Sequence, residues 1–235
     1  MTDLRSKFSN GFRYLFRLPP PWEEATIFDR IFVTREGTIR KEADKDDGWL
    51  FACASSSIRI FDIGANIGQS AFLELYPESV QQVLLVDPNP MALSIAAENL
   101  IMNRLINRVN FECAFVSEQA GEEIEFYTVL SGAAGSIYKS HAKTAAKRNL
   151  HYKVSTTTID DLVKRHGLPD FIKIDVEGAE SNVLAGAKEC LLMHKTRFLV
   201  EMHSNIDLPM VENARRVLDL CNSSGYGAWY LARKV

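Results

Sequence analysis

Four groups of polar residues in this chain each follow directly after a short apolar run. They are Asp62, Gly64 and Asn66; Asp87 and Asn89; Asp175, Glu177 and Glu180; and Glu201 with His203. If the apolar runs are parallel strands, their carboxyl ends meet at one edge of a sheet, where open α/β sheets bind ligands. Carboxylates beside a histidine can accept hydrogen bonds from hydroxyl groups and take up a proton near neutral pH. The sequence therefore predicts a binding and proton-transfer site at this edge.

The first group lies in a glycine turn between two apolar stretches, one ending at Ile63 and one beginning at Ala71. Gly64 and Gly68 permit positive φ and a close approach of backbone to a ligand, as at helix N-termini that bind nucleotides. An ordinary strand-to-helix turn is the alternative, because glycine is common in turns. A dinucleotide fingerprint reads GxGxxG, but Asn66 occupies its second glycine position and no basic residue of this turn can meet a phosphate. The turn therefore favours a nucleoside without phosphate.

Asp87 ends the second apolar run, about 20 positions after the glycine turn, where an acidic residue can accept hydrogen bonds from ribose hydroxyls. Both NAD enzymes and S-adenosylmethionine enzymes use this device, and the missing phosphate contacts favour S-adenosylmethionine. An NAD-type oxidoreductase is the alternative that Asn66 disfavours. A catalytically silent nucleoside-binding module is another.

His203 is the first candidate for a general base, because an unperturbed imidazole has a pKa of about 6.5. Asp175 and Glu177 are rivals: one could be the base, or both with His203 could hold a divalent metal that acidifies a hydroxyl, although no ligand spacing supports a metal. A purely structural role for His203 stays open. Lys173 shares a strand face with Asp175 and is expected to form a buried ion pair with Glu201.

The elements that would position these residues alternate regularly from residue 58 onward. Continuous apolar runs of this kind, separated by helical patterns, predict an α/β protein with a doubly wound, mostly parallel sheet. The expected strands cover 58–63, 83–86, 109–113, 171–176 and 198–200, with a last strand at 229–232. The expected helices end near Pro77, cover 90–103 and 158–166, run through Val183 to Leu192, and start near Pro209.

Other segments are less regular. Residues 27–32 have helical spacing, yet Ile31 to Ile39 also fits a hairpin that turns at Glu36 and Gly37. Lys41 to Asp47 is a charge run that favours a solvated loop. Two extra strands, Glu123–Val129 and Ser136–Tyr138, predict a β-insertion after the third strand, followed by the basic segment 139–153, which is either a loop or short helix or a lid over the site. Residues 1–57 are expected to be an N-terminal arm and extension that packs on a core domain of residues 58–235.

Composition and net charge further narrow the classes of protein to which this chain could belong. The chain has 235 residues, a formal net charge of −3 and four widely spaced cysteines. The net charge gives no overall electrostatic reason to expect nucleic acid as a partner, and the sequence shows no apolar run long enough for a membrane span and no recognisable signal peptide. The cysteine spacing gives no zinc or disulfide pattern, so a reducing, cytoplasmic setting is expected. The sequence leaves a homodimer open.

Five segments together resemble the FkbM family of class I methyltransferases. They are Phe61–Gly68, Val86–Pro90, Thr157–Asp161, Phe171–Glu180 and Leu199–His203. The resemblance covers about residues 58 to 205, and Ile172 to Glu180 is its most specific part. It implies a seven-stranded Rossmann-like sheet, S-adenosylmethionine as methyl donor, and transfer to a hydroxyl of a sugar or small natural product.

By this resemblance, the cofactor turn is formed by Asp62, Gly64, Ala65, Asn66 and Gly68. Asp87 would hold the ribose with Asn89 nearby, at a position where most members of the family carry glutamate. Ala114 and Phe115 would flank the adenine. A nucleic-acid methyltransferase is disfavoured, because the (Asp/Asn)-Pro-Pro-(Tyr/Phe) element is missing after the fourth strand and the chain has no basic surplus.

Overall fold

The computed structural model describes residues 20–42, 44–128, 147, 151–205 and 208–229. Its centre is a parallel sheet of five strands in the order β10-β9-β3-β4-β5. The strands are β3 (Arg59–Ile63), β4 (Gln82–Val86), β5 (Val109–Glu112), β9 (Phe171–Ile174) and β10 (Arg197–Val200). These five strands are the ones that the apolar runs predict. The family resemblance implies seven strands, of which the described residues form five in this sheet.

The sheet reverses its winding between β3 and β9. From β3 the chain moves outward through β4 to β5, then returns to place β9 on the other side of β3, followed by β10. In doubly wound sheets such a reversal leaves a crevice outside the carboxyl ends of the two central strands. The glycine turn follows β3, and Asp175 follows β9, so both border this crevice.

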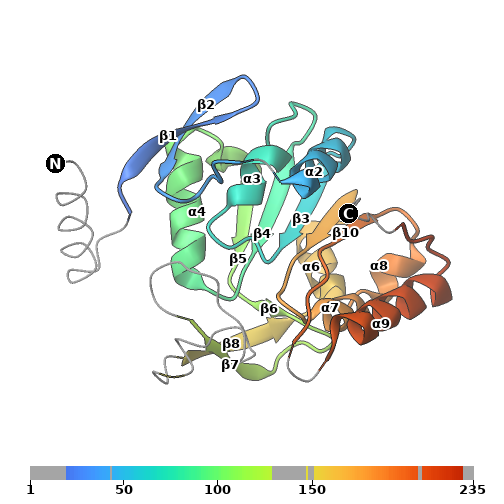
Figure 1. The fold of residues 1–235 in the computed structure, drawn as a ribbon. Helices are drawn as coiled ribbons and strands as arrows, with labels where there is room; N and C mark the ends of the chain where they lie inside the picture. The colour runs from blue at the N-terminus through green and yellow to red at the C-terminus, as the bar shows by residue number, and fades with distance from the viewer. Residues whose placement is uncertain (1–19, 43, 129–146, 148–150, 206–207, 230–235) are drawn as a thin grey trace.

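Helices cover both faces of the sheet (Figure 1). One buried cluster joins Ile60 and Leu85 to α2 (Lys45–Ser55), α3 (Gln69–Glu74) and α4 (Pro90–Met102). The other joins Phe61 and Ile172 to α6 (Ile159–His166), α7 (Glu180–Ala185), α8 (Lys188–Leu192) and α9 (Met210–Ser223). Side chains of a strand alternate between faces, so neighbouring residues such as Ile60 and Phe61 supply two separate cores.

A second, three-stranded sheet lies beside the crevice (Figure 1). Its strands are β6 (Phe115–Val116), β7 (Glu123–Tyr127) and β8 (His151–Thr157), in the order β6-β8-β7. The expected strand that begins at Glu123 is present, whereas Ser136–Tyr138 lies outside the described residues. Residues 151–153 of the basic segment belong to strand β8 rather than to a loop, because they pair with β7 in antiparallel register.

The expectations for residues 22–55 are wrong in two places. The hairpin consists of β1 (Trp22–Ile27) and β2 (Arg30–Arg35) and turns at Phe28 and Asp29, not at Glu36 and Gly37. Phe28 adopts φ 53° although it is not glycine, and its ring packs 4.8 Å from Phe51 and 5.1 Å from Tyr76, measured between centroids. The charge run 41–47 is not a loop throughout, since α2 begins at Lys45.

Asn99 of α4 and Asn103, the C-cap of that helix, hold this hairpin. Asn103 accepts a hydrogen bond from the Val33 N–H at 3.0 Å and donates to the Val33 carbonyl at 2.7 Å. Asn99 accepts from the Arg35 N–H at 2.7 Å, and its amide nitrogen lies 3.4 Å from the carbonyl of Ile67 in the glycine turn. The hairpin and the turn are therefore joined through one buried side chain.

The helix expected through residues 183–192 is two helices. α7 ends at Ala185 and α8 begins at Lys188. The break is stabilised from α6, where Asp160 accepts hydrogen bonds from the N–H groups of Glu189 and Cys190, both at 2.9 Å. These are the free donors at the start of α8 that need a capping acceptor. The α6 boundaries match the expectation, with Thr158 as N-cap and Gly167 as C-cap. Most of the expected strand at 229–232 lies outside the described residues.

Candidate active site

The glycine turn touches the loop that follows β9. Gly64 has φ +88°, and a Cβ added there would lie 1.9 Å from the carbonyl oxygen of Asp175. Gly68 has φ +82°, and its Cβ would lie 2.9 Å from that of Ala96 in α4. Both positions therefore need glycine for conformation and for space. The two central loops of the switch point are in backbone contact at Gly64.

Asp87 is tied to this turn. Its carboxylate accepts a hydrogen bond from the Asn66 N–H and another from the Asn89 N–H, both at 2.8 Å. The residue is 8% exposed. Burial raises the pKa of this carboxyl to about 6, against the two backbone hydrogen bonds, which lower it. Asn89 in turn caps α4 by accepting from the Met91 N–H at 3.1 Å.

A cavity that is partly open to solvent lies over these residues. Several predicted site residues line it together: Gly64, Asn66, Asp87, Asn89, Ala114, Phe115, Asp175 and Glu177. Asp62, Ala65, Gly68 and His203 are not among its lining residues. Ala65 packs into the core beneath the turn.

The cavity also has walls that the sequence reasoning missed. Phe126 of β7 and Val176 after β9 line it, together with Pro88. The three-stranded sheet of β6, β7 and β8 reaches this wall through Tyr152, whose hydroxyl donates to the Pro88 carbonyl at 2.6 Å. Phe126 carried no chemical signal in the sequence, because its pattern is that of any apolar strand residue.

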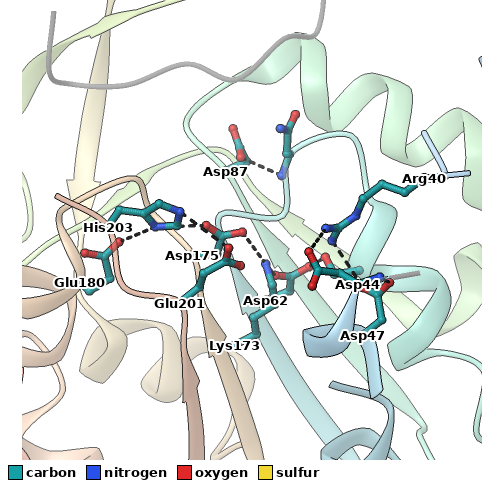
Figure 2. Close-up of polar contacts among 12 residues, drawn as sticks. Arg40, Asp44, Asp47, Asp62, Asp87, Lys173, Asp175, Glu180, Glu201 and His203 are labelled. Atoms are coloured by element: carbon teal, nitrogen blue, oxygen red, sulfur yellow. Dashed lines mark hydrogen bonds and ion pairs between the residues drawn. The ribbon is translucent and has the colours of Figure 1, made fainter. Parts of the chain in front are cut away.

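Lys173 forms its ion pairs within the centre of the sheet (Figure 2). Its Nζ lies 3.3 Å from Asp62 Oδ1 and 3.3 Å from Asp175 Oδ2. The expectation that Lys173 pairs with Glu201 is therefore wrong. The reason is strand register: Lys173 lies opposite Asp62 on the neighbouring strand β3, whereas Glu201 follows the end of β10. Burial alone would lower the pKa of Lys173, but Asp62, Asp175 and Glu74 outweigh it and raise the pKa.

Glu74 completes this buried group of ionisable residues. Its side chain is fully buried, and neither carboxyl oxygen has a hydrogen-bond partner among the described residues. Burial raises the pKa of Glu74 well above its ordinary value, and the charge of Asp62 raises it further. Asp62 itself is fully buried and accepts a hydrogen bond from the Ser70 hydroxyl. Asp62 thus supports the turn from behind rather than lining the cavity.

His203 is surrounded by carboxylates (Figure 2). Its Nδ1 lies 3.3 Å from Glu180 Oε1 and 3.8 Å from Asp175 Oδ1, and its Nε2 lies 3.7 Å from Glu201 Oε1. The hydrogen bond with Glu180 is the main cause that raises the pKa of His203 to about 9; burial opposes it, and the charges of Glu177 and Asp175 add to it. The imidazole is therefore mainly protonated at neutral pH, unlike the unperturbed ring assumed from the sequence.

Glu177 has φ 55°, a left-handed conformation that non-glycine residues adopt rarely. Its loop brings Asp175, Glu177 and His203 together, with one donor atom of each within 4.8 Å of the others. Carboxylates and imidazole could hold a divalent cation at such spacing, but proximity alone assigns none. The same groups can also accept and carry a proton. The structure thus assembles the three residues that the sequence nominated for chemistry.

An open, doubly wound sheet with a cavity at its switch point, and a buried carboxylate beside a glycine turn, is an arrangement typical of Rossmann-like proteins. The profile of the methyltransferase FkbM domain matches residues 62–226. The chain belongs to this family of methyltransferases, and the resemblance inferred from its motifs is confirmed.

Two curated relatives carry informative names. The chain is 33% identical over 180 residues to the 2-O-methyltransferase NoeI of Sinorhizobium fredii (strain NBRC 101917 / NGR234), a match to 70% of this chain and 71% of that protein. It is 25% identical over 177 residues to the 31-O-demethyl-FK506 methyltransferase FkbM of Streptomyces tacrolimicus, a match to 61% and 65% of the two proteins.

Among solved structures, methyltransferase FkbM from Methylobacillus flagellatus KT is similar over 72% of this chain, with 20% identity and a TM-score of 0.48. The match covers 36% of that longer chain. Within the described ranges, this protein has no helix with the length and apolar character needed to cross a bilayer.

Proposed function

We propose that this protein is an S-adenosylmethionine-dependent O-methyltransferase that acts on a hydroxyl group of a sugar or another small acceptor. The observation that carries the proposal is the cavity at the switch point, bordered by the glycine turn and by the buried carboxylate of Asp87. Membership of a methyltransferase family supports methyl transfer. A hydroxyl acceptor is supported by the names of the two relatives, which both denote O-methylation.

The residues present fit the nucleoside part of this cofactor. Each carboxylate oxygen of Asp87 accepts one backbone hydrogen bond and keeps acceptor capacity for ribose hydroxyls. Phe115 and Phe126 give the cavity an apolar wall suited to the adenine ring of the cofactor. We assign Gly64, Asn66, Asp87, Asn89 and Phe115 to direct cofactor contact. Asp62, Ala65 and Gly68 would act indirectly, by holding the turn in shape.

When bound, S-adenosylmethionine supplies a methyl group on a positively charged sulfur, which is a good leaving group. The protein must then hold the acceptor and remove the hydroxyl proton. We propose His203 as the base, with Asp175 and Glu177 as rivals at the cavity wall. The pKa of His203 is raised to about 9. Below that pH, the fraction of molecules with a neutral imidazole therefore increases about tenfold for each unit by which the pH rises. An activity that depends on it rises with pH up to about 9.

Two other functions fit the site less well. An NAD-type oxidoreductase needs backbone and basic groups that meet a pyrophosphate, and Asn66 stands where that fingerprint has glycine. A nucleoside-binding module without activity needs the cavity but not the group of carboxylates around His203. Neither of them accounts for membership of a methyltransferase family.

Calorimetry with S-adenosylhomocysteine tests the cofactor proposal. We expect the wild type to bind it, and Asp87→Ala to bind at least about tenfold more weakly, because buried hydrogen bonds to a charged group contribute about 1.5–3 kcal/mol. Asp219→Ala, which removes an exposed carboxylate from α9, serves as the control and should bind like the wild type. NAD is titrated in parallel. Undetectable binding of S-adenosylhomocysteine to the wild type, or tighter binding of NAD, would overturn the proposal.

The raised pKa of Asp87 predicts a pH-dependent affinity. Only the carboxylate can accept hydrogen bonds on all its oxygen lone pairs, and it becomes protonated as the pH falls through about 6. We therefore expect the dissociation constant for S-adenosylhomocysteine to rise by about tenfold between pH 7.5 and pH 5, with proton release on binding near pH 6. Calorimetry in buffers of different ionisation enthalpy measures both. Asp87→Asn should abolish this pH dependence, and an equal slope in the variant contradicts the assignment.

A further inference from the structure

We propose that Glu180 is a positioning residue for the transfer reaction, which holds the His203 ring with its proton on Nδ1 and so leaves Nε2 free to accept a proton. The inference rests on the proposed function, because it assigns the residue that prepares the base of that reaction. The sequence places Glu180 only among the polar residues that follow the apolar run before Asp175. Its side chain instead turns back toward His203 (Figure 2).

The first observation is that Glu180 is a fully buried carboxylate with three hydrogen-bond donors around it. Its Oε1 accepts from the Gly178 N–H at 2.9 Å and lies 3.3 Å from His203 Nδ1. Its Oε2 accepts from the Asn213 amide at 2.5 Å. A carboxylate removed from water needs such hydrogen bonds and a positive partner. Among these three donors, only the imidazole can carry a positive charge.

The second observation is that Asn213 braces both members of the pair. This residue of α9 is fully buried, and besides Glu180 its amide also donates to the backbone carbonyl of His203 at 3.1 Å. Its side-chain oxygen accepts from the Ser181 N–H at 3.3 Å. One asparagine therefore fixes the carboxylate and the backbone that carries the imidazole. The orientation of the ring is determined by buried groups on α7 and α9.

The third observation concerns the other side of the ring. Nε2 has Glu201 Oε1 at 3.7 Å, beyond hydrogen-bond distance, and the His203 side chain as a whole is 26% exposed. Among the described residues, the other charged groups that act on the ring are Asp175, at 3.8 Å from Nδ1, and Glu177. Lys173 pairs with Asp175 and offsets part of the negative charge. A ring with Nδ1 bound to Glu180 has its unprotonated nitrogen at Nε2.

The proposed proton transfer conserves both atoms and charge. The lone pair of Nε2 takes the proton of the acceptor hydroxyl, whose oxygen keeps the bonding electron pair. The neutral imidazole becomes an imidazolium, and the Glu180 carboxylate stabilises the positive charge without taking up a proton itself. Carboxylates that orient and charge-stabilise a histidine act in this way in hydrolases of unrelated fold.

Nuclear magnetic resonance of the wild type with ¹⁵N-labelled histidine tests the tautomer. The signals of His203 are assigned by their loss in His203→Gln. Above the titration midpoint we expect the neutral ring to carry its proton on Nδ1. In Glu180→Gln we expect the midpoint to fall by at least about one pH unit, because the charged partner is gone. Glu189→Gln, which removes an exposed carboxylate from α8, is the control and should leave the midpoint unchanged.

A proton found on Nε2 in the neutral wild-type ring would overturn the inference, as would an unchanged midpoint in Glu180→Gln. Glu180→Asp is a second variant that keeps the charge but shortens the side chain, and we expect an intermediate midpoint. If both variants fail to fold, the wild-type tautomer alone decides the matter.

The two forms of the cofactor test whether the ring faces the reaction. S-adenosylmethionine carries a positive charge on sulfur, and S-adenosylhomocysteine does not. A cation near Nε2 disfavours the imidazolium, so we expect the His203 midpoint to be about one pH unit lower with S-adenosylmethionine than with S-adenosylhomocysteine. Equal midpoints in the two complexes would overturn the catalytic placement of the pair. Absence of binding for both ligands in calorimetry would instead overturn the proposed function, and with it any part of Glu180 in the transfer.

Discussion

A Gly64→Ala variant is expected to lose about 2–5 kcal/mol of unfolding free energy and at least about 100-fold in affinity for S-adenosylhomocysteine. Two costs add at this position. A left-handed backbone, here φ +88°, costs an L-residue about 1–2 kcal/mol. The new Cβ would also lie 1.9 Å from the Asp175 carbonyl oxygen, so the two loops of the switch point must move apart. Because both loops line the cavity, affinity falls with stability.

Gly121→Ala is the matched control. Gly121 has φ +83°, close to that of Gly64, but an added Cβ there meets no atom within 4 Å. We expect it to lose only about 1–2 kcal/mol from backbone strain and to keep its affinity for S-adenosylhomocysteine. Urea denaturation and calorimetry measure the two quantities. Equal losses for the two variants would mean that the contact between the central loops does not constrain the site.

A Lys173→Met variant is expected to destabilise the protein by about 3–5 kcal/mol, the usual cost of removing one partner from a buried ion pair. Methionine fills a similar volume, so the loss reports charge rather than packing. Without Lys173, the fully buried carboxylate of Asp62 keeps the hydrogen bond from Ser70 but loses its cationic partner, and it lies close to a second acid, Glu74. Denaturation in guanidinium chloride at pH 7 gives the free-energy difference.

Lys164→Met provides the comparison. Lys164 also contacts two carboxylates, Asp161 at 3.6 Å and Glu189 at 3.5 Å, but its side chain is 58% exposed. Exposed ion pairs contribute little because water and salt screen them, so we expect a change below about 1 kcal/mol. A loss below about 1 kcal/mol for Lys173→Met as well would show that the central ion pair does not hold the sheet ends together.

The parallel sheet and the loops at its carboxyl edge could be predicted from the sequence, since their signals are local. Buried strands such as β4 are continuous apolar runs, and the turn at Gly64 is marked by glycine and polar residues in sequence. Winding rules for α/β sheets then bring the polar ends together without further information. This is why Asp87, Asp175 and Glu177 were predicted to share a site and do line one cavity.

Features decided by contacts between distant segments could not be predicted in this way. The hairpin turns at Phe28 because aromatic rings of α2 and of the loop after α3 pack on it, and neither Phe28 nor Asp29 is a glycine or asparagine that marks such a turn. The partner of Lys173 depends on the register of β3 and β9, which composition does not encode. The role of Glu180 depends on Asn213, 33 positions away, and on a helix that breaks after Ala185.

Asn99 of α4 and Asn103, which follows that helix, also cover backbone groups at the outer edge of the β1–β2 hairpin. The outer edge of a two-stranded ribbon presents N–H and C=O groups that can pair with a strand from another chain and begin aggregation. In β2 these groups at Val33 and Arg35 are already engaged by the side chains of Asn103 and Asn99. A helix thus closes a sheet edge with amide groups in place of a third strand. These backbone groups of β2 are therefore not available for pairing with a strand of another molecule.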